Sequence, residues 1–470
     1  MCPSDEWRPL RQPTRSVTYP DAGQLVFGQA AHPVTTRSGL RIGGGSVYPE
    51  INFTLPPMRI TADTMTQVLG NYRDIVEGIC GRAAELAVPG FVTEIELLPP
   101  MTLNPQWGVD VCRTVVETIA GFEATGVRSA VRITPVDVRE GRDLTHMWHG
   151  PQWDAVMATF TGCARAGAEL LAIESVGGKE VHDEAVMYAD LARSVFALTV
   201  LGARDMEHLW TAICGLADDE AVTPAGDTAC GFANTAMVLA ERRYIPRVFA
   251  ATVRVVAAVR SLVAVECGAR GPHKDCGYEG LYVKALTGIP ISMEGRSAAC
   301  AHLSPVGNIS AAAADLWSNE SVQNVKLLSG PAPTVSLEQL AYDARLMNEA
   351  TRRGPEAARL LRDLHVDSDS RLDPQAYVLR PDVAVAIATH LVQTTGDYER
   401  GRLAAQLALA QMRQGHQNGD LLLDPRELEW LDTLSRQADA LPETADELTA
   451  ALRPDLDAAI LAKYDLDQER

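Results

Sequence analysis

The segment from Ser129 to Ser175 is predicted to form a strand, a helix and a second strand. Residues 129–136 are SAVRITPV, residues 153–166 are WDAVMATFTGCARA, and residues 169–175 are ELLAIES. Short apolar runs are typical of buried strands, whereas apolar residues spaced three and four positions apart are typical of a helix that covers a core. The order strand, helix, strand predicts a βαβ unit with two parallel strands.

Further strand candidates continue the alternation on both sides of this unit. They are Phe91–Leu98, Leu198–Leu201, Thr223–Gly226, Ser261–Cys267 and Pro290–Glu294, with an eighth near Asn324–Leu328. Eight strands that alternate with helices over roughly 240 residues predict an α/β fold of the (β/α)8 TIM-barrel type. A doubly wound open sheet is the alternative, but no G-x-G-x-x-G turn follows the first candidate to favour it.

The chain of 470 residues is long enough for a barrel with attachments. Residues 1–60 are rich in glycine and proline and are predicted to be an N-terminal lead-in packed on the barrel. Residues 61–334 are predicted to form the barrel itself. From residue 335 to residue 470 the pattern is helical throughout, which predicts a C-terminal helical region that packs on the barrel.

Composition and charge exclude several classes of protein. Hydrophobic residues make up 46% of the chain and charged residues 22%, which excludes a disordered or fibrous protein. The net charge of -19 argues against binding to nucleic acid or to an anionic membrane surface. Three arginines interrupt the longest apolar stretch, Tyr244–Cys267, and no apolar signal core begins the chain, so we expect a cytoplasmic protein. The nine cysteines include no C-x-x-C pair and are expected to be reduced thiols.

Three segments at or near the ends of predicted strands combine glycine with side chains that bind metals. They are ESVGGKE (174–180), AGDTAC (225–230) and GPHKDCGYE (271–279). The ends of barrel strands meet at one mouth, so Glu174, Cys230 and Cys276 could converge there. Two thiolates and a carboxylate suit zinc. Spacing alone leaves open that both thiols are inert core residues and that Glu174 pairs with a lysine.

Several further blocks extend this pattern along the chain. They are Tyr48–Asn52, Asn104–Gly108, Leu201–Glu207, Arg260–Ala264, Cys300–His302, Trp317–Ser321, Leu340–Asp343 and Asp373–Tyr377. Together with the three segments, and in this order, they resemble the zinc-containing, substrate-activating subunit of methanol:corrinoid methyltransferase. The resemblance runs from about Pro20 to about Leu461, nearly the whole chain.

The resemblance implies an enzyme that transfers the methyl group of methanol to cobalt(I) of a corrinoid, or cobalamin, carried by a partner protein. It also implies a (β/α)8 barrel whose zinc is held by Glu174, Cys230 and Cys276, and a homodimer or a heterotetramer with the corrinoid protein. Methanol is a poor electrophile because its leaving group is hydroxide, and a Lewis acid on the oxygen stabilises the charge that develops there. We therefore expect a coordination position left open for methanol.

The leaving hydroxide also needs a proton. The candidate catalytic residues are Asp227, Asp275, Tyr278 and His302. For Asp227, capping of a helix that begins near Cys230 is an equally good interpretation. His302 could be an ordinary buried histidine.

One position departs from the family pattern. His273 stands where the resemblance leads us to expect a glycine. Its ring could be a fourth metal ligand, an added proton donor or a surface substitution. Lys179 and Lys274 lie near ligands in the sequence and could offset the net negative charge of the site.

Two other functions remain open. The first is the same chemistry with another methyl or methoxy donor. The second is a non-catalytic barrel that acts as a binding scaffold, with a structural zinc fully ligated by protein. A hydrolase is a weaker interpretation, because zinc hydrolases usually use histidine and carboxylate ligands.

Overall fold

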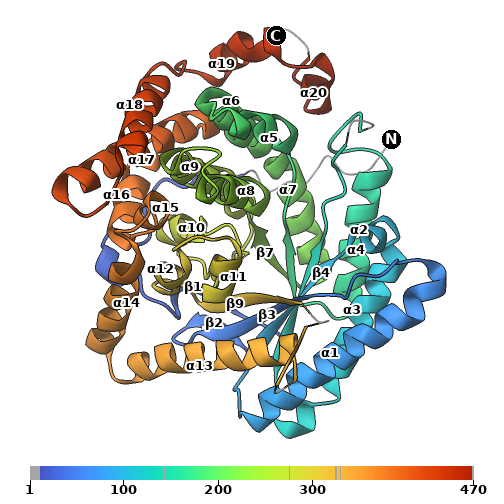
Figure 1. Ribbon diagram of the computed structural model, residues 1–470. Coiled ribbons are helices and arrows are strands. Elements are labelled where there is room, and N and C mark those ends of the chain that lie inside the picture. The colour runs from blue at the N-terminus through green and yellow to red at the C-terminus, as the bar shows by residue number, and fades with distance from the viewer. Residues whose placement is uncertain (1–10, 142–143, 275, 323–324, 329, 468–470) are drawn as a thin grey trace.

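Seven parallel strands form one curled sheet at the centre of the protein (Figure 1). The computed structural model describes residues 11–141, 144–274, 276–322, 325–328 and 330–467. The order of the strands across the sheet is β7-β6-β5-β4-β3-β9-β8, and each neighbouring pair is parallel. Their bounds are Tyr48–Thr54 (β3), Phe91–Leu97 (β4), Ser129–Pro135 (β5), Leu170–Ile173 (β6), Thr223–Asp227 (β7), Ser292–Glu294 (β8) and Leu316–Val322 (β9).

The backbone of residues 270–273 lies between the two edge strands of this sheet. The amide of Arg270 donates to the carbonyl of Pro224 at 2.8 Å, and the amide of Gly271 donates to that of Ala225 at 2.9 Å. On the other side, the amide of His273 donates to the carbonyl of Pro290 at 2.9 Å. This segment therefore connects β7 to β8 through main-chain hydrogen bonds.

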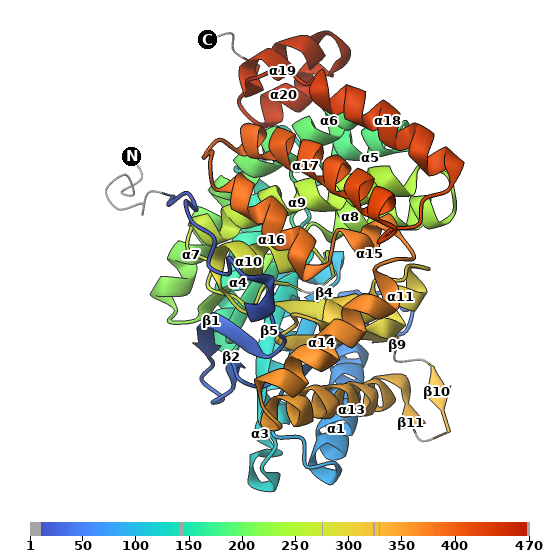
Figure 2. The ribbon, with the colours of Figure 1, turned by 90° about the vertical axis from the view of Figure 1, so that its left-hand side faces the viewer.

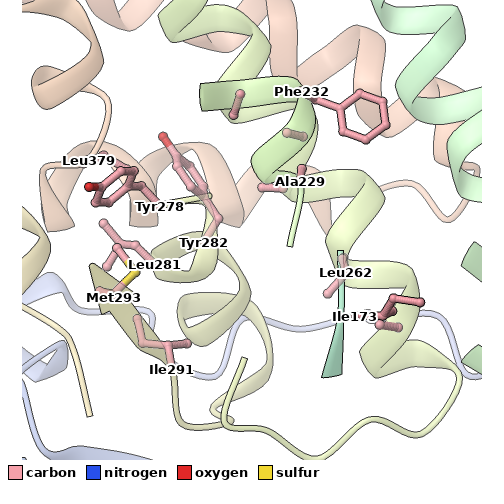
Figure 3. Packing of buried hydrophobic residues seen from close by; sticks show 14 of the residues in the cluster. Ile173, Ala229, Phe232, Leu262, Tyr278, Leu281, Tyr282, Ile291, Met293 and Leu379 are labelled. Atoms are coloured by element: carbon pink, nitrogen blue, oxygen red, sulfur yellow. The ribbon is translucent and has the colours of Figure 1, made fainter. Parts of the chain in front are cut away.

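Helices cover the outer face of the sheet, where each strand presents every second side chain. The helices that follow the strands in turn are α1 (Met65–Glu85), α2 (Pro99–Leu103), α3 (Pro105–Ala120), α4 (Pro151–Ala166), α5 (Lys179–Met187), α6 (Leu191–Phe196), α7 (Ala203–Asp219), α8 (Cys230–Glu241), α9 (Arg247–Glu266), α10 (Gly280–Thr287), α11 (Arg296–Ala301), α12 (Gly307–Ala311) and α13 (Ala332–Arg352). Figure 3 shows a part of the core between these helices, with Phe232 of α8, Leu262 of α9 and Tyr282 of α10.

The remaining helices lie C-terminal to α13. They are α14 (Pro355–Asp369), α15 (Pro374–Tyr377), α16 (Pro381–Leu391), α17 (Asp397–Asn418), α18 (Pro425–Asp439), α19 (Ala445–Leu452) and α20 (Ala458–Lys463). Figure 2 shows α17–α20 stacked over α5, α6, α8 and α9, at the opposite end of the molecule from α1 and α13. Helix α13 packs directly on β3 and β9, and helix α17 packs on α9.

The inner face of the sheet changes from apolar to charged along the strands. Where the strands begin, Val92, Ala130, Leu170 and Leu316 form a small apolar cluster. It is closed by a hairpin of β1 (Gln29–Thr35) and β2 (Arg41–Gly44), which contributes Ile42. Further along the strands the interior side chains are charged. An Nη atom of Arg132 lies 2.8 Å from an Oε atom of Glu50, and neither side chain is exposed. A buried pair of this kind is retained only when other groups complete its hydrogen bonds, and here Ser292 also donates to Glu50 at 2.9 Å.

The structure confirms the α/β class and five of the predicted strands, which correspond to β4–β8. Two predicted strands were wrong: Ser261–Cys267 belongs to α9 apart from its last residue, and Leu198–Leu201 lies in a π-helical turn, Ala197–Gly202. Short apolar runs of this kind do not distinguish strands from buried helices, and α9 is buried on nearly every side.

Two strands of the central sheet were not predicted correctly. β3 lies within the residues expected to be the lead-in. β9 precedes the candidate near Asn324–Leu328, of which Asn324 itself lies outside the described residues. There the described chain instead has a two-stranded hairpin of β10 (Lys326–Leu327) and β11 (Gly330–Pro331). The division of the chain at residues 60 and 334 stays a prediction.

Helix α9 is long and apolar enough to cross a membrane, judged by length and composition alone. However, 94% of its most apolar stretch is buried inside the protein. It contacts α7, α8 and α17, which lie on different sides of it. We conclude that α9 is a core helix.

A buried carboxyl cluster joins the C-terminal helices to α8 and α9. Arg247 lies 3.4 Å from both Glu241 and Asp373, while the carboxylate of Glu427 accepts hydrogen bonds from the first backbone amides of α9. Burial and the neighbouring Asp373 raise the pKa of Glu241 to about 7. The folded protein thus holds a proton that the unfolded chain releases near its ordinary pKa of 4.5. The folded protein therefore has its full stability, as far as Glu241 is concerned, below pH 4.5. It loses this part of its free energy of unfolding as the pH rises through about 7.

We therefore expect Glu241→Gln to leave stability unchanged at pH 4, where the carboxyl is neutral in the folded and the unfolded protein. At pH 8 it should stabilise the protein relative to wild type by on the order of 1–3 kcal/mol, because glutamine mimics the neutral acid. Urea unfolding at the two pH values measures the effect. Glu429→Gln, an exposed change on α18, is the control and should match wild type at both. Equal pH dependence of wild type and Glu241→Gln would contradict the prediction.

Candidate metal centre

Three side chains from separate parts of the chain meet where the strands of the sheet end. Glu174 follows β6 directly, Cys230 is the first residue of α8, and Cys276 follows the segment that connects β7 to β8. Their ligand atoms all lie within 4.8 Å of one another, and the Sγ of Cys276 lies 2.9 Å from an Oε atom of Glu174. Among the residues that the structure describes, this is the one group of three or more metal-binding side chains. The sequence analysis expected this trio.

The donor set and its spacing fit a zinc ion. Zinc binds sulfur at about 2.3 Å and carboxylate oxygen at about 2.0–2.2 Å, so two tetrahedral ligands lie about 3.5–3.8 Å apart. In the trio the Sγ of Cys276 lies 2.9 Å from an Oε atom of Glu174, and all three ligand atoms lie within 4.8 Å of one another, a range that includes these distances. Two soft thiolates favour zinc over magnesium or calcium. The chemistry and the closeness of the three donors therefore suit a zinc ion.

Without a cation the two thiols are held in their neutral form. A hydrogen bond with Cys276 lowers the pKa of Cys230, but burial outweighs it and raises this pKa to about 12. Burial and the adjacent Cys230 raise the pKa of Cys276 well above its ordinary value. Metal binding must therefore displace both thiol protons. The N-terminus of α8 favours the thiolate at Cys230.

Lys274 connects the trio to the charged interior of the sheet. Its Nζ lies 2.6 Å from Glu94, 2.9 Å from Glu96 and 3.4 Å from the ligand oxygen of Glu174, and its side chain is fully buried. Lys179 instead forms an ion pair with Asp183, one turn along α5. Of the two lysines considered from the sequence, Lys274 is the one that offsets the charge of a ligand.

Asn234 supports both cysteines from the first turns of α8. Its Nδ2 donates to the carbonyl of Cys276 and lies 3.5 Å from the Sγ of Cys230. Sequence reasoning missed this residue. The available signal was its position four residues after Cys230, which places both on one face of the helix.

Glu279 fixes the backbone around the cysteines, and His273 is part of that arrangement. The Oε1 of Glu279 accepts hydrogen bonds from the amide of Ala229 at 2.7 Å and from Ser261 at 2.8 Å, and it lies 3.4 Å from the ring of His273. Burial raises the pKa of Glu279, but the hydrogen bonds and the charge of His273 outweigh it and bring this pKa to about 2. The His273 ring is fully buried and does not join the metal-binding group. It is therefore neither a surface substitution nor a fourth ligand.

Asp227 is fully buried and holds the loop that follows Glu174. Its carboxylate accepts hydrogen bonds from the amide of Ser175 at 3.1 Å and from the indole of Trp210 at 2.9 Å. It makes no capping hydrogen bond to α8, so the capping interpretation was wrong. Asp227 therefore stabilises the backbone conformation of the residue that follows Glu174.

Tyr278 and His302 both approach a carboxylate that the sequence analysis did not name. The Tyr278 hydroxyl lies 3.5 Å from the Oε2 of Glu294, and the Nδ1 of His302 lies 3.9 Å from the same atom. Glu294 ends β8, and the rule that the ends of barrel strands carry the site was the signal that could have found it. The remaining candidate, Asp275, lies outside the described residues.

Comparison with known proteins identifies the family of this chain. Residues 12–465 match the family model described as MtaB, the methanol-cobalamin methyltransferase B subunit. The chain belongs to this family. It is 36% identical over 440 residues to the methanol–corrinoid protein co-methyltransferase of Methanosarcina barkeri strain Fusaro, a match that covers 92% of this chain and 94% of that protein. It also matches a chain in the crystal structure of the methanol:cobalamin methyltransferase complex MtaBC from Methanosarcina barkeri. That match has a TM-score of 0.92 and 34% identity over 97% of this chain and 100% of the other.

Membership of the methanol–cobalamin methyltransferase B family confirms the resemblance stated from the sequence. The family model spans nearly the whole described chain, so the sheet and the C-terminal helices both belong to the family fold. The chain is accordingly a methyltransferase that acts with a corrinoid.

Proposed function

We propose that this methanol–cobalamin methyltransferase subunit binds zinc through Glu174, Cys230 and Cys276 and activates methanol there. The observation that carries the proposal is the convergence of one carboxylate and two thiols within 4.8 Å at the end of the sheet. Family membership supports the methyl donor and the corrinoid acceptor.

Side chains around the trio hold the ligands in place and offset the negative charge of the site. When bound, zinc supplies a Lewis acid for the methanol oxygen, which otherwise leaves as hydroxide. Glu174, Cys230 and Cys276 would supply three ligands, the number found in catalytic zinc sites, which keep a further position for substrate. Two thiolates and one carboxylate give a formal charge of -1 with the ion, and Lys274 lies beside the carboxylate to offset it. Asn234 and Glu279 hold the backbone that carries both cysteines.

We further propose that the sheet is a closed barrel of eight positions. Residues 270–273 make main-chain hydrogen bonds to both β7 and β8, which supports an eighth strand position between them. The ligands would then lie at the carboxyl-terminal mouth, where active sites of TIM barrels form.

The mouth is also where a partner must bring its cobalt. Cobalt(I) attacks the methyl carbon from the side opposite the leaving oxygen, so the corrinoid has to approach along the axis of the barrel. A relative of this chain is found in the MtaBC complex, which supports a separate corrinoid protein as partner. We expect a homodimer or a heterotetramer with that protein, in the cytoplasm.

Methylation of free cobalamin tests the proposed function. We expect zinc-loaded protein, methanol and chemically reduced cobalamin to yield methylcobalamin, followed by its absorbance. Removal of zinc by a chelator should lower the rate to background, and added zinc should restore it. Transfer from a methoxybenzene or a methylamine, but not from methanol, would favour another donor. No transfer from any donor, with zinc that resists chelation, would favour a binding scaffold.

A further inference from the structure

The alternation of side chains along the strands places Glu294 on the inner face of the sheet. Ile291, just before β8, and Met293 on β8 belong to the outer core, whereas Ser292 points inward and donates to Glu50. Successive side chains of a strand point to opposite faces, so Glu294 shares the inner face with Ser292. Glu294 is the last residue of β8, and Glu174 occupies the corresponding place after β6. Both carboxylates therefore face the interior at the mouth.

Two proton-carrying side chains surround Glu294 at this level. The hydroxyl of Tyr278 lies 3.5 Å from its Oε2, and the imidazole of His302 lies 3.9 Å from the same oxygen. The Glu294 carboxyl is nearly buried, while 27% of the His302 side chain is exposed. The negative charge of Glu294 also contributes to the raised pKa of Cys230. Thus the buried carboxyl at the end of β8 has a partly exposed histidine 3.9 Å away.

The other candidate proton donors already have hydrogen-bond partners within the protein. Asp227 is held by Trp210 and Ser175, and His273 lies against Glu279. The carboxylate of Glu96 accepts hydrogen bonds from Lys274 and Asn52.

We propose that the carboxyl group of Glu294 donates the proton to the departing oxygen of methanol, and that His302 returns a proton from solvent. This inference rests on the proposed function. The carbon–oxygen bond breaks and its electron pair stays on oxygen, while the electron pair of cobalt(I) forms the cobalt–carbon bond and leaves cobalt(III). The oxygen takes the proton of Glu294 and departs as water. The resulting carboxylate is then reprotonated through His302.

Charged and titratable groups around Glu294 set its pH dependence. Tyr278 and His302 face it directly, Cys230 lies within range of its field, and Arg254 stacks over the Tyr278 ring at 5.2 Å. A general acid must hold its proton, so the rate should fall on the alkaline side of the pH profile.

The test compares Glu294→Gln with Glu320→Gln in the zinc-loaded full chain, with methanol and reduced cobalamin. Glu320 is a matched control because it is another glutamate near the end of a central strand, is exposed, and bonds to Thr54. We expect Glu294→Gln to lower kcat by about 10²–10³-fold, within the usual range for a general acid. The Glu294→Gln variant should bind as much zinc as the wild type. Its rate should no longer fall on the alkaline side of the pH–rate profile. Glu320→Gln should behave as wild type.

The outcomes separate this proposal from the proposed function. Failure of wild type to methylate cobalamin overturns the function itself, and this inference with it. An active wild type beside a zinc-loaded Glu294→Gln variant that keeps more than a tenth of kcat overturns the proton donor alone. Loss of zinc in proportion to activity overturns it as well. Should Glu294→Gln not fold, Glu294→Asp decides: a 5- to 20-fold lower kcat with the alkaline limb retained supports the proposal, and an unchanged kcat overturns it.

Discussion

Cys276→Ala is expected to abolish both zinc binding and methyl transfer. The substitution removes one of two thiolates and leaves Glu174 and Cys230, which are too few ligands for a stable zinc site. Loss of a residue that only orients a ligand already costs about 10–100-fold in affinity or activity, so loss of the ligand itself should cost well over 100-fold. Zinc content by elemental analysis and the rate of methylcobalamin formation measure the two effects.

Cys267→Ala is the matched control for this experiment. Cys267 lies nine positions earlier, directly after α9, and is buried, but it does not join the trio. Its thiol contacts the carbonyl of Glu207 at 3.8 Å. The variant should therefore keep its zinc and its activity. Full activity of Cys276→Ala without zinc would exclude the proposed metal site.

The sequence predicted five of the seven strands of the central sheet, including β4 and β8, whose inner faces carry Glu94, Glu96 and Glu294, and it missed β3 and β9. β3 carries Glu50 and Asn52 on its inner face, and β9 carries Ser318 and Glu320. These residues break the apolar pattern by which a buried strand is identified. A polar inner face alone does not hide a strand, because β4 was predicted. β3 also lies within the glycine- and proline-rich first 60 residues, and β9 carries Asn319 and Ser321 on its outer face.

The ligand trio could be named from the sequence because glycine-bearing segments and a family resemblance pointed to it. The residues that hold the trio could not. Asn234, Glu279 and Glu294 act through contacts between elements that lie far apart in the chain, and no spacing rule relates Glu279 to Ala229, 50 positions earlier. His273 shows the same limit, because its partner and its burial decide among roles that the sequence left open.

The charged interior makes Lys274 the position where a single substitution should destabilise the fold most. Lys274→Met removes the cation from a site where Glu94 is fully buried and lies 2.6 Å away. Removal of one partner of a buried ion pair typically costs about 3–5 kcal/mol, because the other charge stays out of water. We expect a loss of this size in the free energy of unfolding, measured with urea.

Two further variants identify the cause of this loss. Lys179→Met removes a lysine whose ion pair with Asp183 is partly exposed, and it should cost less than about 1 kcal/mol. In the double variant Lys274→Met with Glu94→Gln, the buried charge is gone together with its partner, so at least half of the lost stability should return. If the double variant is no more stable than Lys274→Met alone, the loss comes from packing of the lysine stem. In that case the charge of Glu94 does not explain the loss of stability, and the contacts of Lys274 with Glu96 and Glu174 are its remaining electrostatic roles.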